Sequence, residues 1–167
     1  MKNTFARILF LTAWLTASSA WATTMAGVVF VVIDGDTVLF KPDHAPATAR
    51  AFMKIRLADI DAPEKEQPYG EASTRMLTEL VLNRHVEVDI VATDIYGRSI
   101  ARIQMGTVQV NAEMVRRGAA WASTRARSDT DLMEAQQDAR KERRGLWQAT
   151  EPMPPWEWRR AYNASVN

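Results

Sequence analysis

Two short apolar runs, both rich in β-branched residues, stand close together in the first quarter of the chain. The first covers residues 28–33 and the second covers residues 37–40. Asp34-Gly35 lies between them, and an Asp-Gly pair flanked by β-forming runs is a strong hairpin signal. The pattern therefore predicts two antiparallel strands joined by a tight turn.

Three further strands are expected after a proline-containing loop at residues 42–51. Residues 52–60 predict the third strand, because apolar side chains recur at every second position. Residues 86–90 alternate between apolar and acidic side chains, as a half-buried strand does. A turn at Tyr96-Gly97 leads to the fifth strand, which includes residues 100–103.

Helical spacing of apolar residues marks three other segments. Residues 70–82 place small and apolar side chains along one stripe of a helix. Asn111 is expected to cap a second helix that runs to Arg117 and ends before Gly118. A third helix is expected to begin near Asp129, where the sequence resembles a capping box.

The order of these elements predicts an α+β fold. Five strands in mainly sequential hairpins can form a closed barrel or a two-layer open sheet with helices on one face. A closed barrel hides the edges of the sheet, which favours it. We expect residues 23–150 to form one domain. Residues 151–167, which hold three prolines with Trp156 and Trp158, predict an extended tail.

The first 22 residues have the pattern of an export signal. Lys2 and Arg7 precede an apolar stretch at residues 8–17, and Ala20-Trp21-Ala22 fits a small-x-small cleavage site. An N-terminal anchor or a buried helix is the alternative, but the apolar stretch is short for a membrane span. We expect cleavage after Ala22 or Ala20, and a periplasmic or secreted protein.

Composition excludes several kinds of site. The 167 residues include no cysteine and two histidines, which excludes disulfides, thiolate metal centres and thiol nucleophiles and disfavours a multi-histidine metal site. Without the first 22 residues, which hold two basic residues and no acidic one, the chain carries a net charge of −1. A globally basic surface that coats nucleic acid is therefore not predicted.

Acidic residues gather at the ends of the predicted strands. Asp34 and Asp36 flank the first turn, and Asp59, Asp61 and Glu64 follow the third strand. Turn chemistry can account for Asp34, whereas Asp36 and Asp61 adjoin apolar runs where their charges should repel. A hard cation such as Ca²⁺, which binds carboxylate, carbonyl and water oxygens, would relieve that repulsion. Solvated strand ends are the alternative.

Two arginines add a second kind of chemistry. Arg56 lies within an otherwise apolar strand, and Arg98 follows the Tyr96-Gly97 turn. Arg56 either pairs with a carboxylate or joins Arg98 in gripping a phosphate through its planar donors. A cation, two arginines and a carboxylate that accepts a proton from water, here Glu64, suffice for phosphoryl transfer. The motifs of serine hydrolases, zinc proteases and phosphate-binding loops do not occur in the sequence.

Several motifs, in order, resemble the staphylococcal (micrococcal) nuclease family, also called thermonucleases. They extend over about residues 26–147, nearly all of the predicted domain. The motifs are VIDGDTV at 32–38, IRLADIDAPE at 55–64, YGEA at 69–72, DIYGR at 94–98, NAEMVRRG at 111–118 and RRGLW at 143–147.

The resemblance implies a five-stranded OB-type β-barrel with three α-helices and a Ca²⁺ site. By their place in the motifs, Asp36 and Asp61 resemble the carboxylates that bind Ca²⁺. The backbone carbonyl of Ala62 resembles a further ligand. Asp34 resembles a carboxylate that lies near the metal without binding it directly.

The resemblance also implies hydrolysis of DNA and RNA that leaves 3′-phosphate ends. Arg56 and Arg98 resemble the pair that binds the phosphate and stabilises its charge. Glu64 resembles the residue that orients or deprotonates the attacking water. Tyr96, with Asp94 in the same motif, resembles the tyrosine of the nucleotide pocket, where a ring can stack on a base.

The sequence thus predicts an exported nuclease that acts as a monomer on DNA and RNA, without stable membrane association once the signal is removed. A catalytically inactive nucleic-acid-binding OB-fold module is the alternative. Such modules typically lose the catalytic carboxylates or arginines, whereas this chain retains them. An exported protein that binds a partner through its tail is a third hypothesis.

Overall fold

The computed structural model describes residues 23–44, 52–123, 126 and 129–166. The predicted export signal with its cleavage site lies outside the described residues, as does most of the predicted loop at residues 42–51. Within the described ranges, no helix combines the length and the apolar character needed to cross a membrane.

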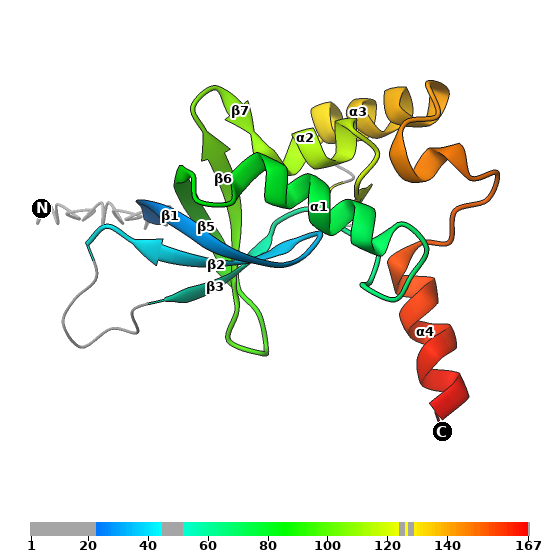
Figure 1. Ribbon diagram of the computed structural model, residues 1–167, viewed down its shortest axis with the longest axis horizontal. Helices are drawn as coiled ribbons and strands as arrows, with labels where there is room; N and C mark the ends of the chain where they lie inside the picture. The colour runs from blue at the N-terminus through cyan, green and yellow to red at the C-terminus, as the bar shows by residue number, and fades with distance from the viewer. Residues whose placement is uncertain (1–22, 45–51, 124–125, 127–128, 167) are drawn as a thin grey trace, which may run out of the picture.

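Strands and helices follow one another along the described chain as shown in Figure 1. The strands are β1 (Thr23–Asp34), β2 (Thr37–Pro42), β3 (Met53–Leu57), β4 (Ile60–Asp61), β5 (His85–Thr93), β6 (Ser99–Met105), β7 (Val108–Gln109) and β8 (Trp121–Ala122). The helices are α1 (Gly70–Val81), α2 (Val110–Arg116), α3 (Thr130–Lys141), the 3₁₀ helix η2 (Gly145–Gln148) and α4 (Pro155–Val166).

Five strands close into a barrel in the order β3-β2-β1-β5-β6, because β3 also pairs with β6. The closing pair is parallel and sets Ile55 opposite Ser99, whereas the other barrel pairs are antiparallel. This confirms the predicted α+β fold with an OB-type barrel and excludes the open two-layer sheet. The predicted hairpin is also confirmed, since β1 and β2 are joined at Gly35-Asp36.

β1 pairs with two neighbouring strands of the barrel. Its first half pairs with β5 and its second half with β2. The two pairings overlap at Gly27 and Val28. A Cβ on Gly27 would lie 2.2 Å from the carbonyl oxygen of Lys41, so no side chain fits there. A bulge between Val32 and Asp34 lies directly before the turn. Bulges of this kind redirect the side chains that follow them.

The barrel interior and the inner faces of the helices form the core. α1 packs on β1 and α2, and α2 packs on β6 and α3. α1 buries the stripe predicted from its spacing, including Ser73, Leu77 and Leu80. A smaller cluster forms around Trp121 and Trp147, whose rings meet edge to face with centroids 4.3 Å apart.

Asn111 does not cap α2, contrary to the prediction. Gln109 caps the helix with its side-chain oxygen, and Asn111 lies in the first turn with 2% of its surface exposed. Its Oδ1 accepts the N–H of Ile103 at 3.0 Å, and its Nδ2 donates to the carbonyls of Ala58 and Ala101 at 2.9 and 3.2 Å. A buried amide needs such partners, so Asn111 joins three segments of the fold.

The C-terminal tail is not extended throughout, so that prediction is wrong for residues 155–166, which form α4. Pro155 is the first residue of the helix, where the missing N–H of proline costs nothing. Trp156 lies against Trp121, with ring centroids 5.5 Å apart. Figure 1 shows α4 beginning beside the loop that leads into α1 and then extending away from the barrel.

Candidate active site

A cleft of about 900 Å³ opens where β2, β3 and β4 meet the turn between β5 and β6. Every site residue predicted from the sequence lines this cleft. The structure therefore brings together residues from four separate stretches of the chain. These residues are Asp34, Asp36, Arg56, Asp61, Ala62, Glu64, Asp94, Tyr96 and Arg98.

Arg56 lies between Asp36 and Asp61 and binds both carboxylates. Its Nη1 is 2.5 Å from Asp36 Oδ1, and its Nη2 is 2.9 Å from Asp61 Oδ1. Asp36 and Asp61 are buried, with 4% and 6% of their surfaces exposed. The N–H of Ala62 donates to Asp36 Oδ2 at 2.9 Å, which places the Ala62 backbone beside the same carboxylate. The interpretation that Arg56 pairs with a carboxylate is confirmed.

Local backbone geometry sets up this arrangement. Asp59 adopts a left-handed conformation with φ of 63° in the turn between β3 and β4, a conformation that aspartate tolerates better than most residues. The chain reverses direction at this turn, which brings Asp61 of β4 next to Arg56 of β3. Asp34 Oδ1 accepts the N–H of Asp36 at 3.0 Å. Asp34 therefore shapes the turn, as its turn chemistry predicts, and also adds a negative charge to the cleft.

The electrostatics of the cleft suit a hard cation. Burial raises the pKa of Asp36 to about 6; Arg56 opposes the rise, and the charges of Asp34 and Asp61 add to it. The buried carboxylates of Asp36 and Asp61 offer oxygen atoms, which calcium prefers to softer ligands. Among the residues that the structure describes, no three His, Cys, Asp or Glu side chains form a metal-binding group. Water oxygens would therefore have to complete the coordination.

Asp94 organises the part of the cleft that is formed by the turn between β5 and β6. Its Oδ1 accepts the N–H groups of Tyr96 and Arg98, both at 2.9 Å, and its Oδ2 accepts Arg98 Nε at 2.6 Å. Despite the opposing effect of desolvation, these hydrogen bonds hold the pKa of Asp94 below its ordinary value. Tyr96 is 78% exposed, and its ring centroid lies 5.5 Å from the Arg98 guanidinium carbon. An exposed ring thus stands beside a fixed guanidinium.

Arg159 of α4 lies in the cleft, and the sequence analysis did not predict it. Its Nη1 is 2.5 Å from Glu64 Oε1, and its Nη2 is 2.7 Å from Asp61 Oδ2. The hydrogen bonds to Asp61 and Glu64 raise the pKa of Arg159. The signal was the spacing of Trp156 and Arg159, three positions apart, which places both on one face of a helix. This spacing is informative only if the segment is helical, and an extended tail does not place the two residues on one face.

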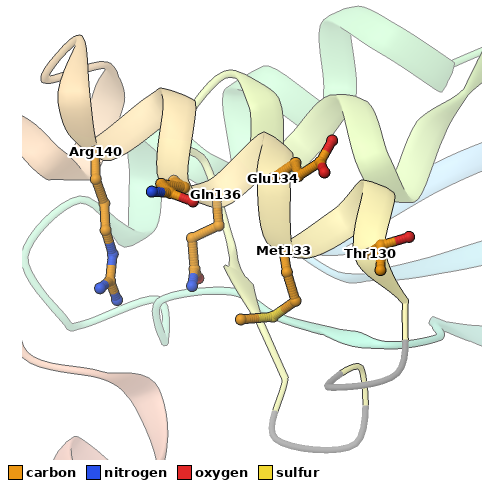
Figure 2. Close-up of a pocket in the computed structure, with 6 residues that line it drawn as sticks. Thr130, Met133, Glu134, Gln136 and Arg140 are labelled. Atoms are coloured by element: carbon orange, nitrogen blue, oxygen red, sulfur yellow. The ribbon is translucent and has the colours of Figure 1, made fainter.

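A second hollow runs along α3 and holds no comparable set of groups. Figure 2 shows Met133, Gln136 and Arg140 extending from the same side of the helix. Gln136 Oε1 accepts the N–H of Ala122 at 2.9 Å, and the Arg140 guanidinium lies 4.2 Å from the ring centroid of Trp147. These groups attach α3 to the rest of the domain. The cleft around Asp36 is therefore the candidate active site.

Comparison with known proteins shows what this chain resembles. Residues 54–149 match the sequence profile of the family described as "Staphylococcal nuclease homologue". Protein ParB of Escherichia coli is 39% identical over 161 residues, which cover 89% of this chain and 86% of ParB.

Two further relatives carry names that include an activity. An uncharacterized endonuclease of Escherichia coli O157:H7 is 37% identical over 160 residues, 95% of this chain and 98% of that protein. The micrococcal nuclease of Shigella flexneri is 34% identical over 159 residues, 89% of this chain and 87% of that protein. The similarity thus extends over most of the chain and most of each relative.

Proposed function

Because this chain belongs to the family of staphylococcal nuclease homologues, we propose that it is a Ca²⁺-dependent nuclease that hydrolyses DNA and RNA and leaves 3′-phosphate ends. The observation that carries the proposal is the meeting of Asp36, Arg56, Asp61, Glu64 and Arg98 in one cleft. A binding module has no need of this combination of buried carboxylates, guanidinium groups and a further carboxylate. The hypothesis of an inactive binding module is therefore disfavoured.

The proposed roles follow from the chemistry of each side chain. Arg98 and Arg56, the second of which also binds Asp36 and Asp61, offer planar donors that match phosphate oxygens and stabilise the charge that develops on them during hydrolysis. Glu64 is only partly buried, so it can accept a hydrogen bond from water and orient it toward the phosphorus. The exposed ring of Tyr96 offers a surface on which a base can stack, and Asp94 holds Arg98 beside it.

Asp36, Asp61 and the backbone carbonyl of Ala62 are the groups that would hold the cation. Asp36 and Asp61 are both buried, and burial raises the pKa of Asp36, so a cation beside it would stabilise its charged form. A bound Ca²⁺ would supply Lewis-acid stabilisation of phosphate charge. Phosphate binding, orientation of water and stacking on the base would all come from side chains of the protein.

We also propose that the protein is exported and works as a monomer in the periplasm or outside the cell. The support is the sequence pattern of residues 1–22, with cleavage after Ala22 or Ala20. Purification from culture fractions, followed by determination of the N-terminal sequence, tests export and the cleavage position together.

The enzymatic proposal is tested with the purified protein on single-stranded DNA, duplex DNA and RNA. Digestion is expected with Ca²⁺ and is expected to stop in the presence of a calcium chelator, and end-group analysis should find 3′-phosphates. Asp36→Asn should abolish digestion because it removes a proposed cation ligand. Asp43→Asn is the matched control, since Asp43 is exposed and pairs with His85 outside the cleft. Full activity in chelator would contradict the cation assignment.

A further inference from the structure

The segment that follows residue 151 is attached to the wall of the cleft. Trp156 lies against Trp121, with centroids 5.5 Å apart. Trp121 belongs to β8 and is the pairing partner of Asp61 in β4. The aromatic contact therefore anchors the start of α4 next to the strand that carries a proposed cation ligand.

A buried glutamine ties the same segment to the backbone of Glu64. Gln67 is 5% exposed, and its Nε2 donates to the carbonyl of Met153 at 2.6 Å. Its Oε1 accepts the N–H of Glu64 at 3.1 Å. Both ends of one side-chain amide are thus used, and they join the C-terminal segment to the residue proposed to orient water.

Arg159 makes the corresponding connection at the side chain. One guanidinium contacts Glu64 Oε1 at 2.5 Å and both oxygens of Asp61, at 3.2 and 2.7 Å. The planar donors of arginine fix the relative orientation of two carboxylates, which a single point charge does not. Glu64 would otherwise be free to change rotamer, because it projects from a loop and is partly exposed.

We propose that α4 completes the active site and that Arg159 is a positioning residue that holds the Glu64 carboxylate beside Asp61. The proposal rests on the proposed role of Glu64 in hydrolysis. It assigns a catalytic contribution to a segment that lies beyond the barrel domain. Arg159 acts through Glu64, so its loss should affect turnover rather than substrate binding.

The experiment compares Arg159→Ala, Arg159→Lys and Arg160→Ala in the intact chain. Arg160 is exposed on the same helix and outside the cleft, so its variant controls for the loss of one positive charge facing a polyanion. Arg159→Ala should lower kcat on single-stranded DNA at least about tenfold with little change in KM, because a small misplacement is costly. Arg159→Lys should restore part of this loss, and Arg160→Ala should resemble the wild type.

Cation binding gives a second readout, measured by calorimetry without substrate. Arg159→Ala should bind Ca²⁺ roughly threefold more tightly or better, since it removes a positive charge next to Asp61. A residue that only stabilised the fold would not produce tighter cation binding together with slower turnover. Equal kcat and equal Ca²⁺ affinity in Arg159→Ala and Arg160→Ala would overturn the proposal. A higher kcat in Arg159→Ala would also overturn it, because α4 would then obstruct the site.

A third readout separates this proposal from the proposed function. If the wild-type protein cleaves no nucleic acid, the proposed function fails, and the contact can still be tested by thermal unfolding. The Tm changes of Arg159→Ala and Glu64→Ala should be non-additive in the double variant, as expected for residues in direct contact. Additive changes would show that Arg159 does not hold Glu64.

Discussion

Asp94 Oδ2 accepts the Nε–H of Arg98 at 2.6 Å, across a turn whose two backbone N–H groups bind the other oxygen of the same carboxylate. The contact is made by Nε, the guanidinium nitrogen nearest the backbone. It therefore fixes the stem of the arginine without using the two terminal Nη groups. One carboxylate thus determines both the shape of the turn and the position of the guanidinium.

Arg98→Ala should lower turnover at least about 10²-fold, as the removal of one transition-state donor commonly does. Steady-state kinetics on single-stranded DNA measure the effect. Arg75→Ala is the control, because Arg75 is an exposed residue of α1 that pairs with Glu71 outside the cleft. Near-wild-type turnover in Arg98→Ala would show that the phosphate clamp is wrongly assigned.

Glu64→Gln should keep the fold and Ca²⁺ binding but lose turnover by about 10²-fold or more, because an amide cannot accept a proton from water. Kinetics, calorimetry and thermal unfolding together test this expectation. Glu66→Gln, two residues away in an exposed position, serves as the matched control. If Glu64→Gln instead lost stability in proportion to activity, Glu64 would be a structural residue.

Calcium affinity should depend on pH through Asp36, whose pKa burial raises to about 6. A protonated carboxyl does not bind a cation. Calcium affinity should therefore be highest well above pH 6, where Asp36 is deprotonated, and should fall as the pH drops through that value. Below it, the dissociation constant should rise by roughly tenfold per pH unit. Calorimetric titrations between pH 7.5 and 5 measure this, with circular dichroism to verify folding. A pH-independent affinity would exclude Asp36 as a ligand.

Asn111→Ala should reduce the free energy of unfolding by about 2–3 kcal/mol, since it removes three hydrogen bonds and leaves buried backbone groups unpaired. Urea denaturation measures the change. Gln137→Ala, at an exposed position of α3, should leave stability nearly unchanged. Equal stability of the two variants would mean that Asn111 is not a structural link.

Local patterns predicted the strands and turns well. The Asp34-Gly35 hairpin, the strand around Ile55 and the helix at residues 70–82 all follow from the spacing of apolar side chains and from turn residues. These signals depend on residues close together in the chain, and their physical causes act over the same short range. The structure confirms them for that reason.

Predictions failed where a residue type fits two different structural roles equally well. The amide of Asn111 suits a helix cap, but in the fold it lies within reach of Ala58, 53 positions away. The prolines before Trp156 suit an extended tail, and they also suit the start of a helix. The packing of distant segments chooses between such uses, and no local pattern records that choice.

The order of residues alone identified the family resemblance, the barrel class and the nine candidate site residues, because motifs and periodicity are carried by neighbouring positions. The meeting of Asp36, Arg56 and Asp61 required the pairing of β2 with β3, which sets Thr37 opposite Arg56, and the reversal at Asp59. The spacing of Trp156 and Arg159 can place both on one face of a helix, but only the fold brings Arg159 to Asp61, which lies 98 positions away in the chain. A contact of that range exists only when packing, here of Trp156 on Trp121, holds the two segments together.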